Sequence, residues 1–509
     1  MSELLDRRPA GALAVLCLAG ALPVVRALLV PDLNWCYRYM TSDSYDWISN
    51  GLFLAGEPVT STMRPPGLPL LIAALWKAGA LSFLPVVNFL FLGLSTAALF
   101  LLLRERHDGW IAALACWFFF ANDAVQDLAR YVMAETYGTP FLVLAALAFV
   151  RAGRDPRAYV AMGAALGAGV LFSYAAALSA LGLAVAVLIL RPADVRRRSL
   201  WWGVLAAGAP LGAWVAFRAS YYRAHPGLLR HGVETLIRPN LSNLSLYAVA
   251  LPAVLGLLVL PLYVAGAFRL DARDETARRY RAAVFAPLLA LSAFWLFVYD
   301  WADRRFLVYL LPFLVCFLAE GLEWMRAFAR RGRLATAGAA AFVVAALLWN
   351  QIRYPTYGFY FLALTPEHFL EAAMTQTPAQ KTELHLTGAR IARLHGSLRS
   401  AFSRGLFDWR EKAPECPQTD SSFTCLATLK READSLLRPG QPVGLFTPRG
   451  WPQDYWASTN RLANAWRRPV ALPSIAEITL AGEEALPKAE GAHLPVVAHC
   501  GPYILVRTR

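Results

Sequence analysis

Residues 85–122 read PVVNFLFLGLSTAALFLLLRERHDGWIAALACWFFFAN, and this stretch decides the fold class. Two continuous apolar runs, 85–103 and 109–122, flank the short charged segment RERHD. A hydrocarbon layer about 30 Å thick requires roughly 20 apolar residues in a helix, and lipid admits only helices or closed barrels. The apolar residues are continuous rather than alternating, so the pattern predicts membrane-spanning helices joined by a charged connection.

The same pattern recurs along residues 1–351, and it dominates a composition that is 57% hydrophobic and 17% charged. The mean hydropathy of +0.42 is therefore concentrated in long runs. The expected spans are 9–30, 85–103, 109–122, 135–151, 158–174, 176–191, 200–218, 244–268, 282–299, 305–325 and 334–351. The sequence thus predicts an all-α polytopic membrane bundle of about eleven transmembrane helices.

The basic residues indicate how this bundle is oriented. With the N-terminus placed inside, the inside connections carry 20 Lys plus Arg in 50 residues, whereas the outside connections carry 9 in 97. This bias follows the positive-inside rule. The net charge of +14 is therefore distributed as orientation signals, which argues against a nucleic-acid partner. The apolar but proline-broken stretch 66–84 is expected to be interfacial or re-entrant, because counting it as a span would reverse every later connection.

The orientation divides the chain into two domains. Residues 1–351 form the transmembrane domain, with 31–84 as its first outer loop, and 352–509 form a soluble domain on the outer side. This second domain is expected to be a small α/β unit, with a helix over 366–405 and strands over 442–448 and 494–507. Cys416 and Cys425 flank one of its polar loops, and an outer location permits a disulfide between them.

Charged residues on the outer side gather at the ends of spans. Asp43 and Asp46 lie in the first outer loop, and Arg64 precedes a Pro-Pro-Gly turn. A solvated loop with a proline-initiated interfacial helix accounts for these residues without any function. Glu135 enters a span from the outer side, where helix capping is the alternative to a functional role.

A second basic feature lies outside, where arginine is otherwise scarce. Arg304 and Arg305 precede the span 305–325. Snorkelling toward lipid headgroups would explain them, and so would recognition of a phosphate by planar guanidinium groups.

These motifs, in this order, resemble the GT-C glycosyltransferases, the group that includes the protein O-mannosyltransferases and the lipid A aminoarabinose transferase. The order is an acidic first outer loop, then Arg-Pro-Pro-Gly-x-Pro at 64–69, an acidic residue after the second outer loop, and Arg-Arg-Phe-x-x-Tyr-x-x-Pro at 304–312. The resemblance covers the layout of about residues 1–350. It implies a polyprenyl-phosphate sugar donor, an inverting transfer, and a first-loop carboxylate as base. Asp43 matches that position best, and Asp46 stays open.

The resemblance also assigns the other charged residues. Glu135 matches the second-loop acidic position, and Arg64, Arg304 and Arg305 match residues that bind the donor phosphate. A carboxylate to take the acceptor proton, cations to stabilise the departing phosphate and an apolar groove for the isoprenoid are what such a transfer requires.

The expected location is the inner membrane of a bacterium, as a multi-pass protein with a cytoplasmic N-terminus and a periplasmic C-terminal domain. The acceptor is a lipid, a glycan or a protein, with membrane lipid as surroundings. No cofactor is assigned. A divalent metal stays an alternative, with His225, His231 and Glu234 as candidate ligands, although no zinc-type Cys/His spacing occurs.

Three other functions compete with the transferase. A transporter or lipid flippase is the main alternative, although such proteins place charges and broken helices at mid-membrane, often in two repeated halves. An O-antigen ligase or polymerase would carry its key residues in a large late outer loop. A non-catalytic membrane scaffold is the last alternative.

Overall fold

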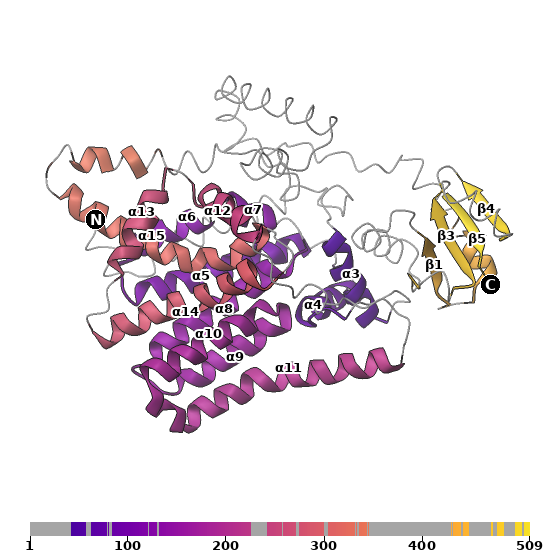
Figure 1. Ribbon diagram of the computed structural model, residues 1–509, viewed down its shortest axis with the longest axis horizontal. Coiled ribbons are helices and arrows are strands. Elements are labelled where there is room, and N and C mark those ends of the chain that lie inside the picture. Colours follow the sequence, from indigo (N-terminus) through magenta and orange to yellow (C-terminus); the bar gives the residue numbers. More distant parts are fainter. Residues whose placement is uncertain are drawn as a thin grey trace, which may run out of the picture.

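The structure is a computed structural model, and Figure 1 shows a helical bundle together with a small sheet. It describes residues 42–56, 63–78, 80, 84–120, 122–129, 132–224, 242–256, 258–270, 274–299, 304–330, 332, 335–339, 341–343, 345, 429, 431–438, 441–446, 470–471, 476–482, 494–500 and 503–508. The expected first span, the helix over 366–405, and the Cys416 and Cys425 pair lie outside these residues.

The helices of the bundle follow the predicted apolar runs. They are α3 (Ser42–Leu54), α4 (Gly67–Lys77), α5 (Leu84–Arg104), α6 (Gly109–Phe120), α7 (Asp123–Leu128), α8 (Ala134–Arg151), α9 (Ala158–Phe172), α10 (Ala175–Leu190), α11 (Arg198–Ala224), α12 (Ser242–Leu255), α13 (Leu260–Arg269), α14 (Glu275–Phe297) and α15 (Leu307–Ala329). Two short 3₁₀ helices, η3 (Pro192–Arg196) and η5 (Arg304–Phe306), precede α11 and α15. The fold is therefore the all-α bundle that the sequence predicts.

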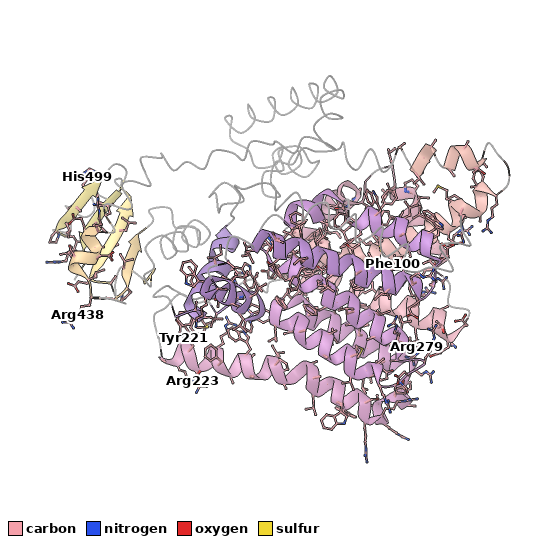
Figure 2. All side chains as sticks on the ribbon, turned by 180° about the vertical axis from the view of Figure 1, so that it is seen from behind. Phe100, Tyr221, Arg223, Arg279, Arg438 and His499 are labelled. Atoms are coloured by element: carbon pink, nitrogen blue, oxygen red, sulfur yellow. The ribbon has the colours of Figure 1, made fainter. Side chains whose placement is uncertain are left out.

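Four of the described helices are long and apolar enough to cross a membrane by length and composition: Val86–Arg104, Arg198–Ala224, Glu275–Phe297 and Leu307–Ala329. The shorter apolar helices are α4, α6, α9 and α10. Figure 2 shows the two ends of the bundle, with Tyr221 and Arg223 at one and Arg279 at the other. We call the first the α3–α4 end, because these two helices lie there, and the second the Arg279 end.

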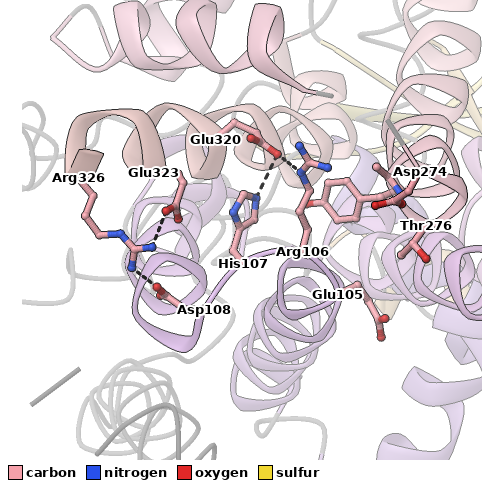
Figure 3. Close-up of a pocket in the computed structure, with 11 residues that line it drawn as sticks. Glu105, Arg106, His107, Asp108, Asp274, Thr276, Glu320, Glu323 and Arg326 are labelled. Carbon is pink, nitrogen blue, oxygen red and sulfur yellow. Dashed lines mark hydrogen bonds and ion pairs between the residues drawn. The ribbon is translucent and has the colours of Figure 1, made fainter. Parts of the chain in front are cut away.

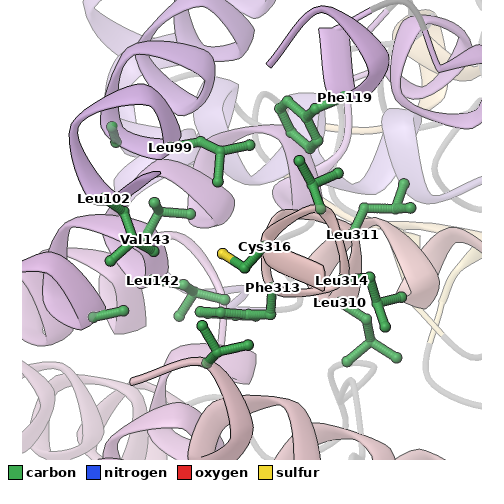
Figure 4. Packing of buried hydrophobic residues seen from close by; sticks show 14 of the residues in the cluster. Leu99, Leu102, Phe119, Leu142, Val143, Leu310, Leu311, Phe313, Leu314 and Cys316 are labelled. Atoms are coloured by element: carbon green, nitrogen blue, oxygen red, sulfur yellow. The ribbon is translucent and has the colours of Figure 1, made fainter. Parts of the chain in front are cut away.

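Helix α15 is the core of the bundle. Every residue from Leu307 to Leu322 is buried, and α5, α6, α8, α13 and α14 all contact α15. Around Cys316, side chains of α5, α6 and α8 interdigitate with those of α15 (Figure 4). α15 therefore links the two ends of the bundle through a densely packed core.

Small residues let neighbouring helices approach closely. A Cβ atom on Gly163 of α9 would lie 1.9 Å from the carbonyl oxygen of Gly203 on α11, and one on Gly266 of α13 would lie 1.7 Å from Phe317 O on α15. Such glycine contacts are typical of helices packed in lipid. α11 lies at the edge of the bundle (Figure 1), and Trp202 and Leu205 on it are exposed, as expected of a lipid-facing helix.

Two elements differ in detail from the sequence prediction, and a third agrees with it. The run 244–268 forms two helices, α12 and α13, because the chain turns at Gly256, whose φ of 86° suits glycine. α11 has 27 residues and extends beyond the expected 200–218. α4 has 11 residues and rises only about 16 Å, so it is too short to cross, in agreement with an interfacial or re-entrant element.

Helices α9 and α10 form an unusually short hairpin. They contain 15 and 16 residues, and only Ser173 and Tyr174 separate them. Each rises about 22–24 Å, whereas the hydrocarbon layer is about 30 Å thick. The turn at Ser173 lies beside Gly138, about one turn inside the start of α8, and α4 packs against it, with Gly67 beside Leu171 O and Phe172.

The C-terminal sheet is mixed, as expected for a small α/β unit. Its strands are β1 (Val443–Phe446), β2 (Val470–Ala471), β3 (Ile478–Gly482), β4 (Val496–Cys500) and β5 (Tyr503–Arg507), in the order β2-β1-β3-β5-β4. β1 is parallel to β2 and β3, and β5 is antiparallel to β3 and β4. Strands β1, β4 and β5 occupy the two segments that the sequence predicted as strands.

Candidate functional site

Two residues predicted from the sequence form an ion pair at the α3–α4 end. Glu135 lies in the first turn of α8, and its Oε1 is 3.4 Å from Nε of Arg305, which precedes α15. The exposed fractions of the two side chains are 7% and 13%. A buried charge is tolerated only with a partner of opposite charge. Glu135 and Arg305 each provide such a partner for the other.

The backbone explains why these two side chains meet. The backbone of Met133 is extended, so α8 begins at Ala134. Glu135 therefore lies in the first turn, at the positive end of the helix dipole. The turn η5 brings Arg305 to the start of α15, which contacts α8. The Arg305 guanidinium also lies 5.2 Å from the ring centroid of Phe306 and 3.9 Å from Met133 Sδ.

Two hydroxyl groups lie one turn farther into the bundle. The Tyr309 hydroxyl of α15 and the Ser173 hydroxyl at the α9–α10 turn are 2.5 Å apart, and both residues are buried. Gly138 of α8 lies beside them, because a Cβ there would be 3.0 Å from Ser173 Cβ and 3.4 Å from Tyr309 Cε1. Tyr309 also lies within the range of the charges of Glu135 and Arg305. We call Glu135, Arg305, Tyr309 and Ser173 the polar cluster.

Aromatic packing fixes the first turns of α8 around this cluster. The Tyr137 hydroxyl donates to Asn88 Oδ1 of α5, and its ring stacks on Phe172 at a centroid distance of 5.8 Å. Phe91 of α5 contacts the same ring, with centroids 4.7 Å apart. α8 is thus held on both sides of the residues that carry the polar cluster.

The first outer loop lies at the same end of the bundle. The Arg64 backbone N–H donates to Asn50 Oδ1 at 2.9 Å, and its guanidinium lies 5.0 Å from the ring centroid of Trp47. Met63 has a φ of 52°, a left-handed conformation that is strained for this residue type, and it packs on Trp214 of α11. These contacts hold Arg64 against the first-loop elements at this end of the bundle.

The other predicted residues are only partly described. Asp43 and Asp46 lie in α3, and Arg304 lies in η5, but their side chains are outside the described part of the structure. His225, His231 and Glu234 are outside it as well. Among the residues described, no three His, Cys, Asp or Glu side chains are placed to hold a metal ion.

Sequence reasoning did not single out Ser173 or the role of Tyr309. Tyr309 belongs to the Arg-Arg-Phe-x-x-Tyr motif, so its position in the motif could have indicated that it lies near Arg305. Ser173 is a lone serine between two apolar runs, and such a residue looks like any helix-connecting turn.

A second polar region lies at the Arg279 end. Along α15, its residue Glu320 is 11 residues, or about 17 Å of helix, from Tyr309 of the polar cluster. It is a cavity of about 430 Å³. Its lining residues are Glu105, Arg106, His107, Asp108, Asp274, Thr276, Ala277, Tyr280, Glu320, Glu323 and Arg326. Figure 3 shows Arg106 and His107 directed at Glu320, and Arg326 between Asp108 and Glu323.

The charges of this cavity compensate one another. Arg106 pairs with Glu320, whose Oε1 is also 3.5 Å from His107 Nε2, and Arg326 binds Asp108. Burial, followed by the charge of Arg106, lowers the pKa of His107 to about 4, so the imidazole is neutral at pH 7. The cavity is therefore best described as a polar junction between the α5–α6 connection and the far end of α15.

No protein-family model matches the chain, and no curated protein matches it. Solved structures resemble it over almost its whole length, and they show that the chain has the fold of the GT-C glycosyltransferases, as the resemblance in sequence predicted. ArnT from Cupriavidus metallidurans bound to undecaprenyl phosphate gives a TM-score of 0.55 at 14% identity, covering 97% of this chain and 98% of ArnT. The apo form of the same ArnT gives 0.54 at 14% identity, covering 98% of both chains.

A second GT-C protein shares the fold less completely. The archaeal oligosaccharyltransferase AglB from Archaeoglobus fulgidus, in complex with an inhibitory peptide and a dolichol-phosphate, gives a TM-score of 0.50 at 14% identity. The match covers 95% of this chain and 71% of AglB. At such identities the comparisons establish the polytopic membrane fold.

Proposed function

We propose that the chain is a membrane glycosyltransferase that moves a sugar from a polyprenyl-phosphate donor to an acceptor hydroxyl. The observation that carries this proposal is the buried Glu135–Arg305 pair with Tyr309 beside it, at one end of a GT-C fold. An ionisable pair at this depth is a functional site by default. The lipid phosphates in the ArnT and AglB structures support a polyprenyl carrier as donor.

Arginine side chains bind the donor phosphate in this proposal. Arg305 contacts Glu135 through Nε, and a guanidinium has five N–H donors in a planar fork. Its terminal nitrogens are therefore suited to a phosphate while Nε keeps the carboxylate contact. Arg304 on η5 and Arg64 on the first loop add positive charge at the same end, which stabilises the phosphate as it leaves.

The transfer itself is a single displacement. Asp43, with Asp46 as the alternative, takes the proton of the acceptor hydroxyl. The acceptor oxygen forms a bond to the anomeric carbon while the bond from that carbon to the phosphate oxygen breaks, and the polyprenyl phosphate leaves with the electron pair. Attack opposite the leaving group inverts the anomeric configuration. Glu135 orients Arg305 toward the phosphate.

The charge distribution supports an orientation for this chemistry. The connections at the Arg279 end contain Arg151, Arg154, Arg157 and Arg191, whereas the α3–α4 end is poor in basic residues. The positive-inside rule favours the Arg279 end as cytoplasmic. The polar cluster and the C-terminal domain then face the periplasm of a bacterial inner membrane.

One assay tests the proposal. Purified protein is incubated with bacterial membrane lipid extract and a panel of polyprenyl-phosphate sugars, and consumption of each donor is measured by mass spectrometry, with and without EDTA. Asp43→Asn, Asp46→Asn and Glu135→Gln are compared with Asp155→Asn, an exposed carboxylate at the Arg279 end.

The expected result is donor consumption by the wild type and by Asp155→Asn, and a loss of at least about 100-fold in Glu135→Gln and in one of the two first-loop variants. Full activity of both first-loop variants would overturn the assignment of the base. No transfer from any donor, together with substrate flux in proteoliposomes, would replace the transferase by a transporter or flippase.

A further inference from the structure

We propose that Met63 is a positioning residue: its buried side chain anchors a left-handed backbone conformation, and this conformation directs the Arg64 guanidinium at the donor phosphate. The inference rests on the proposed function, in which Arg64 adds positive charge at the phosphate, and it adds a residue to that site. It starts from the backbone of Met63, whose φ is 52°. Among the residues that the structure describes, Met63 is the one non-glycine residue with a positive φ.

The left-handed conformation of Met63 has a cost that glycine would avoid. In this region the Cβ atom crowds the following carbonyl oxygen, and methionine lacks the short polar side chain with which Asn or Asp stabilises the conformation locally. Residues held in this way gather at ligand clamps and switch regions, where the surrounding structure enforces them. Contacts with the rest of the protein must therefore hold Met63 in place.

The side chain of Met63 supplies these contacts. It is 2% exposed and forms a buried cluster with Trp214 and Tyr222 of α11. Phe53 of α3 and Tyr221 of α11 pack against this cluster with their ring centroids 5.2 Å apart, at the end of α11 that lies by α3 and α4 (Figure 2). A flexible, polarisable thioether is well suited to a site among aromatic rings, so the side chain anchors the backbone in its unfavourable conformation.

The chain after Met63 has little freedom of its own. Arg64 precedes Pro65, which restricts Arg64 to extended conformations, and the rings of Pro65 and Pro66 fix their own φ angles before α4 begins. The Arg64 N–H is held by Asn50 Oδ1 of α3 at 2.9 Å. The φ of Met63 therefore decides on which side of the first loop the Arg64 side chain lies.

The same anchor relates Arg64 to the polar cluster. Trp214, which packs with Met63, donates from Nε1 to the Tyr174 hydroxyl at 3.3 Å. Tyr174 lies in the α9–α10 turn that borders the polar cluster. Met63 thus ties the first loop, through α11, to this turn. The connection fixes Arg64 relative to Arg305, as two cations that share one phosphate require.

The test separates the backbone of position 63 from its side chain. Met63→Leu, Met63→Ala and Met63→Gly are compared with the wild type in full-length protein, and Met162→Ala and Met162→Gly are the matched controls. Met162 is also buried, but it lies within the regular helix α9. The Kd of undecaprenyl phosphate and the donor KM and kcat are measured, together with the melting temperature of each variant in detergent.

We expect Met63→Leu, which keeps the anchor, to bind undecaprenyl phosphate as the wild type does. Met63→Ala should weaken binding and raise the donor KM by about tenfold, because the backbone without its anchor relaxes to a negative φ and turns Arg64 away. Met63→Gly also lacks the anchor, but glycine adopts a positive φ readily, so binding should stay within about threefold of the wild type. Both variants of Met162 should keep wild-type binding, and Met162→Gly should have the lower melting temperature of the two.

The order of the alanine and glycine variants decides the inference. If Met63 only fills space, Met63→Gly leaves the larger void and binds no better than Met63→Ala, and that order would overturn the proposal. An equal difference between the two variants in the Arg64→Ala background would overturn it as well, because no guanidinium is then left to direct. Failure of the proposed function looks different, because the wild type itself would then neither bind undecaprenyl phosphate nor transfer sugar.

Discussion

Glu135 and Arg305 are each nearly inaccessible to water, so their mutual attraction replaces lost hydration. Glu135 lies in the first turn of α8, 16 residues from Arg151 at the other end of the helix. Loss of one charge of this pair would leave the other buried and less well compensated, so the pair can be tested through stability as well as activity.

Arg305→Gln should lower the free energy of unfolding by roughly 3 kcal/mol, because it removes a positive partner from the buried Glu135 carboxylate. Glu135→Gln/Arg305→Gln should recover most of that stability while transfer stays abolished, since both charges of the pair are then removed. Thermal unfolding in detergent measures both variants. Equal melting temperatures for wild type and Arg305→Gln would contradict the ion pair.

Gly138→Ala should impair transfer by forcing Ser173 and Tyr309 apart, because the added Cβ would lie 3.0 Å from Ser173 Cβ. Overpacking of this kind costs about 1–3 kcal/mol. Gly93→Ala in α5 is the control, because a Cβ there meets nothing within 4 Å. Donor consumption and melting temperature should both fall in Gly138→Ala and stay at the wild-type level in Gly93→Ala.

At the residue scale, the sequence predicted Glu135 and Arg305 as functional residues, and the structure brings their side chains together. Two patterns indicated these residues: a charged residue at the end of a span, and the order of the motifs along the chain. Ser173 carries no such signal, because its importance comes from a contact with a residue 136 positions away. The roles of Asp43 and Asp46 stay predictions.

Helices α9 and α11 make the most extensive helix pair in the bundle, and they do so through backbone contact at Gly163 and Gly203. Dispersion between closely packed backbones drives such association in lipid, where apolar side chains gain little from leaving the bilayer. The stability of this edge of the bundle should therefore depend on the absence of side chains there.

Gly163→Ala should lower the melting temperature in detergent, because its Cβ would overlap the carbonyl of Gly203. We expect a loss of about 1–3 kcal/mol. Gly208→Ala and Gly212→Ala on α11 are controls, since nothing lies within 4 Å of either position. A Gly163→Ala variant as stable as these controls would contradict the close approach.

The connection between α5 and α6 should make stability depend on pH. Burial, with the charge of Arg106, lowers the pKa of His107 to about 4 from its model-compound value of 6.5. A base whose pKa is lowered by folding is protonated first in the unfolded chain, so stability is full above pH 6.5 and decreases as the pH falls toward 4. The maximum effect is about 3 kcal/mol.

His107→Gln should remove this contribution between pH 6.5 and 4 and flatten the dependence of the melting temperature on pH. Asp108 serves as a reference, because hydrogen bonds with Ile111 N–H and Arg326 outweigh its burial and lower its pKa, so its contribution is lost only at more acidic pH. An unchanged pH profile in His107→Gln would rule out the imidazole as its source.

At the element scale, apolar periodicity predicted where helices form, and the structure differs mainly where backbone geometry intervenes. Gly256 divides the run 244–268, because a left-handed φ of 86° ends α12. The proline-broken stretch after Arg64 yields the short α4. Sequence hydropathy does not record such turns, since it measures transfer to lipid and not the path of the chain.

At the scale of the whole molecule, two polar regions lie at opposite ends of a core that α15 spans. The polar cluster contains residues that we propose act on a substrate, whereas Glu105, Asp108, Glu320 and Glu323 at the Arg279 end are paired with arginines. The comparison with ArnT covers nearly all of both chains, which includes both ends. The sequence predicted Glu135 and Arg305 on one side of the membrane, whereas the cavity could not be located from sequence, because Arg106 and Glu320 are 214 residues apart.

The short α9–α10 hairpin has a consequence for the bilayer itself. Because its turn lies beside Gly138, about one turn inside the start of α8, an acceptor hydroxyl under the proposed function must pass the ends of the longer helices to reach the polar cluster. Hydrophobic mismatch should therefore regulate turnover. In nanodiscs of increasing acyl-chain length, we expect transfer to a water-soluble acceptor to fall severalfold, while a membrane-anchored acceptor, delivered from within the leaflet, keeps its rate.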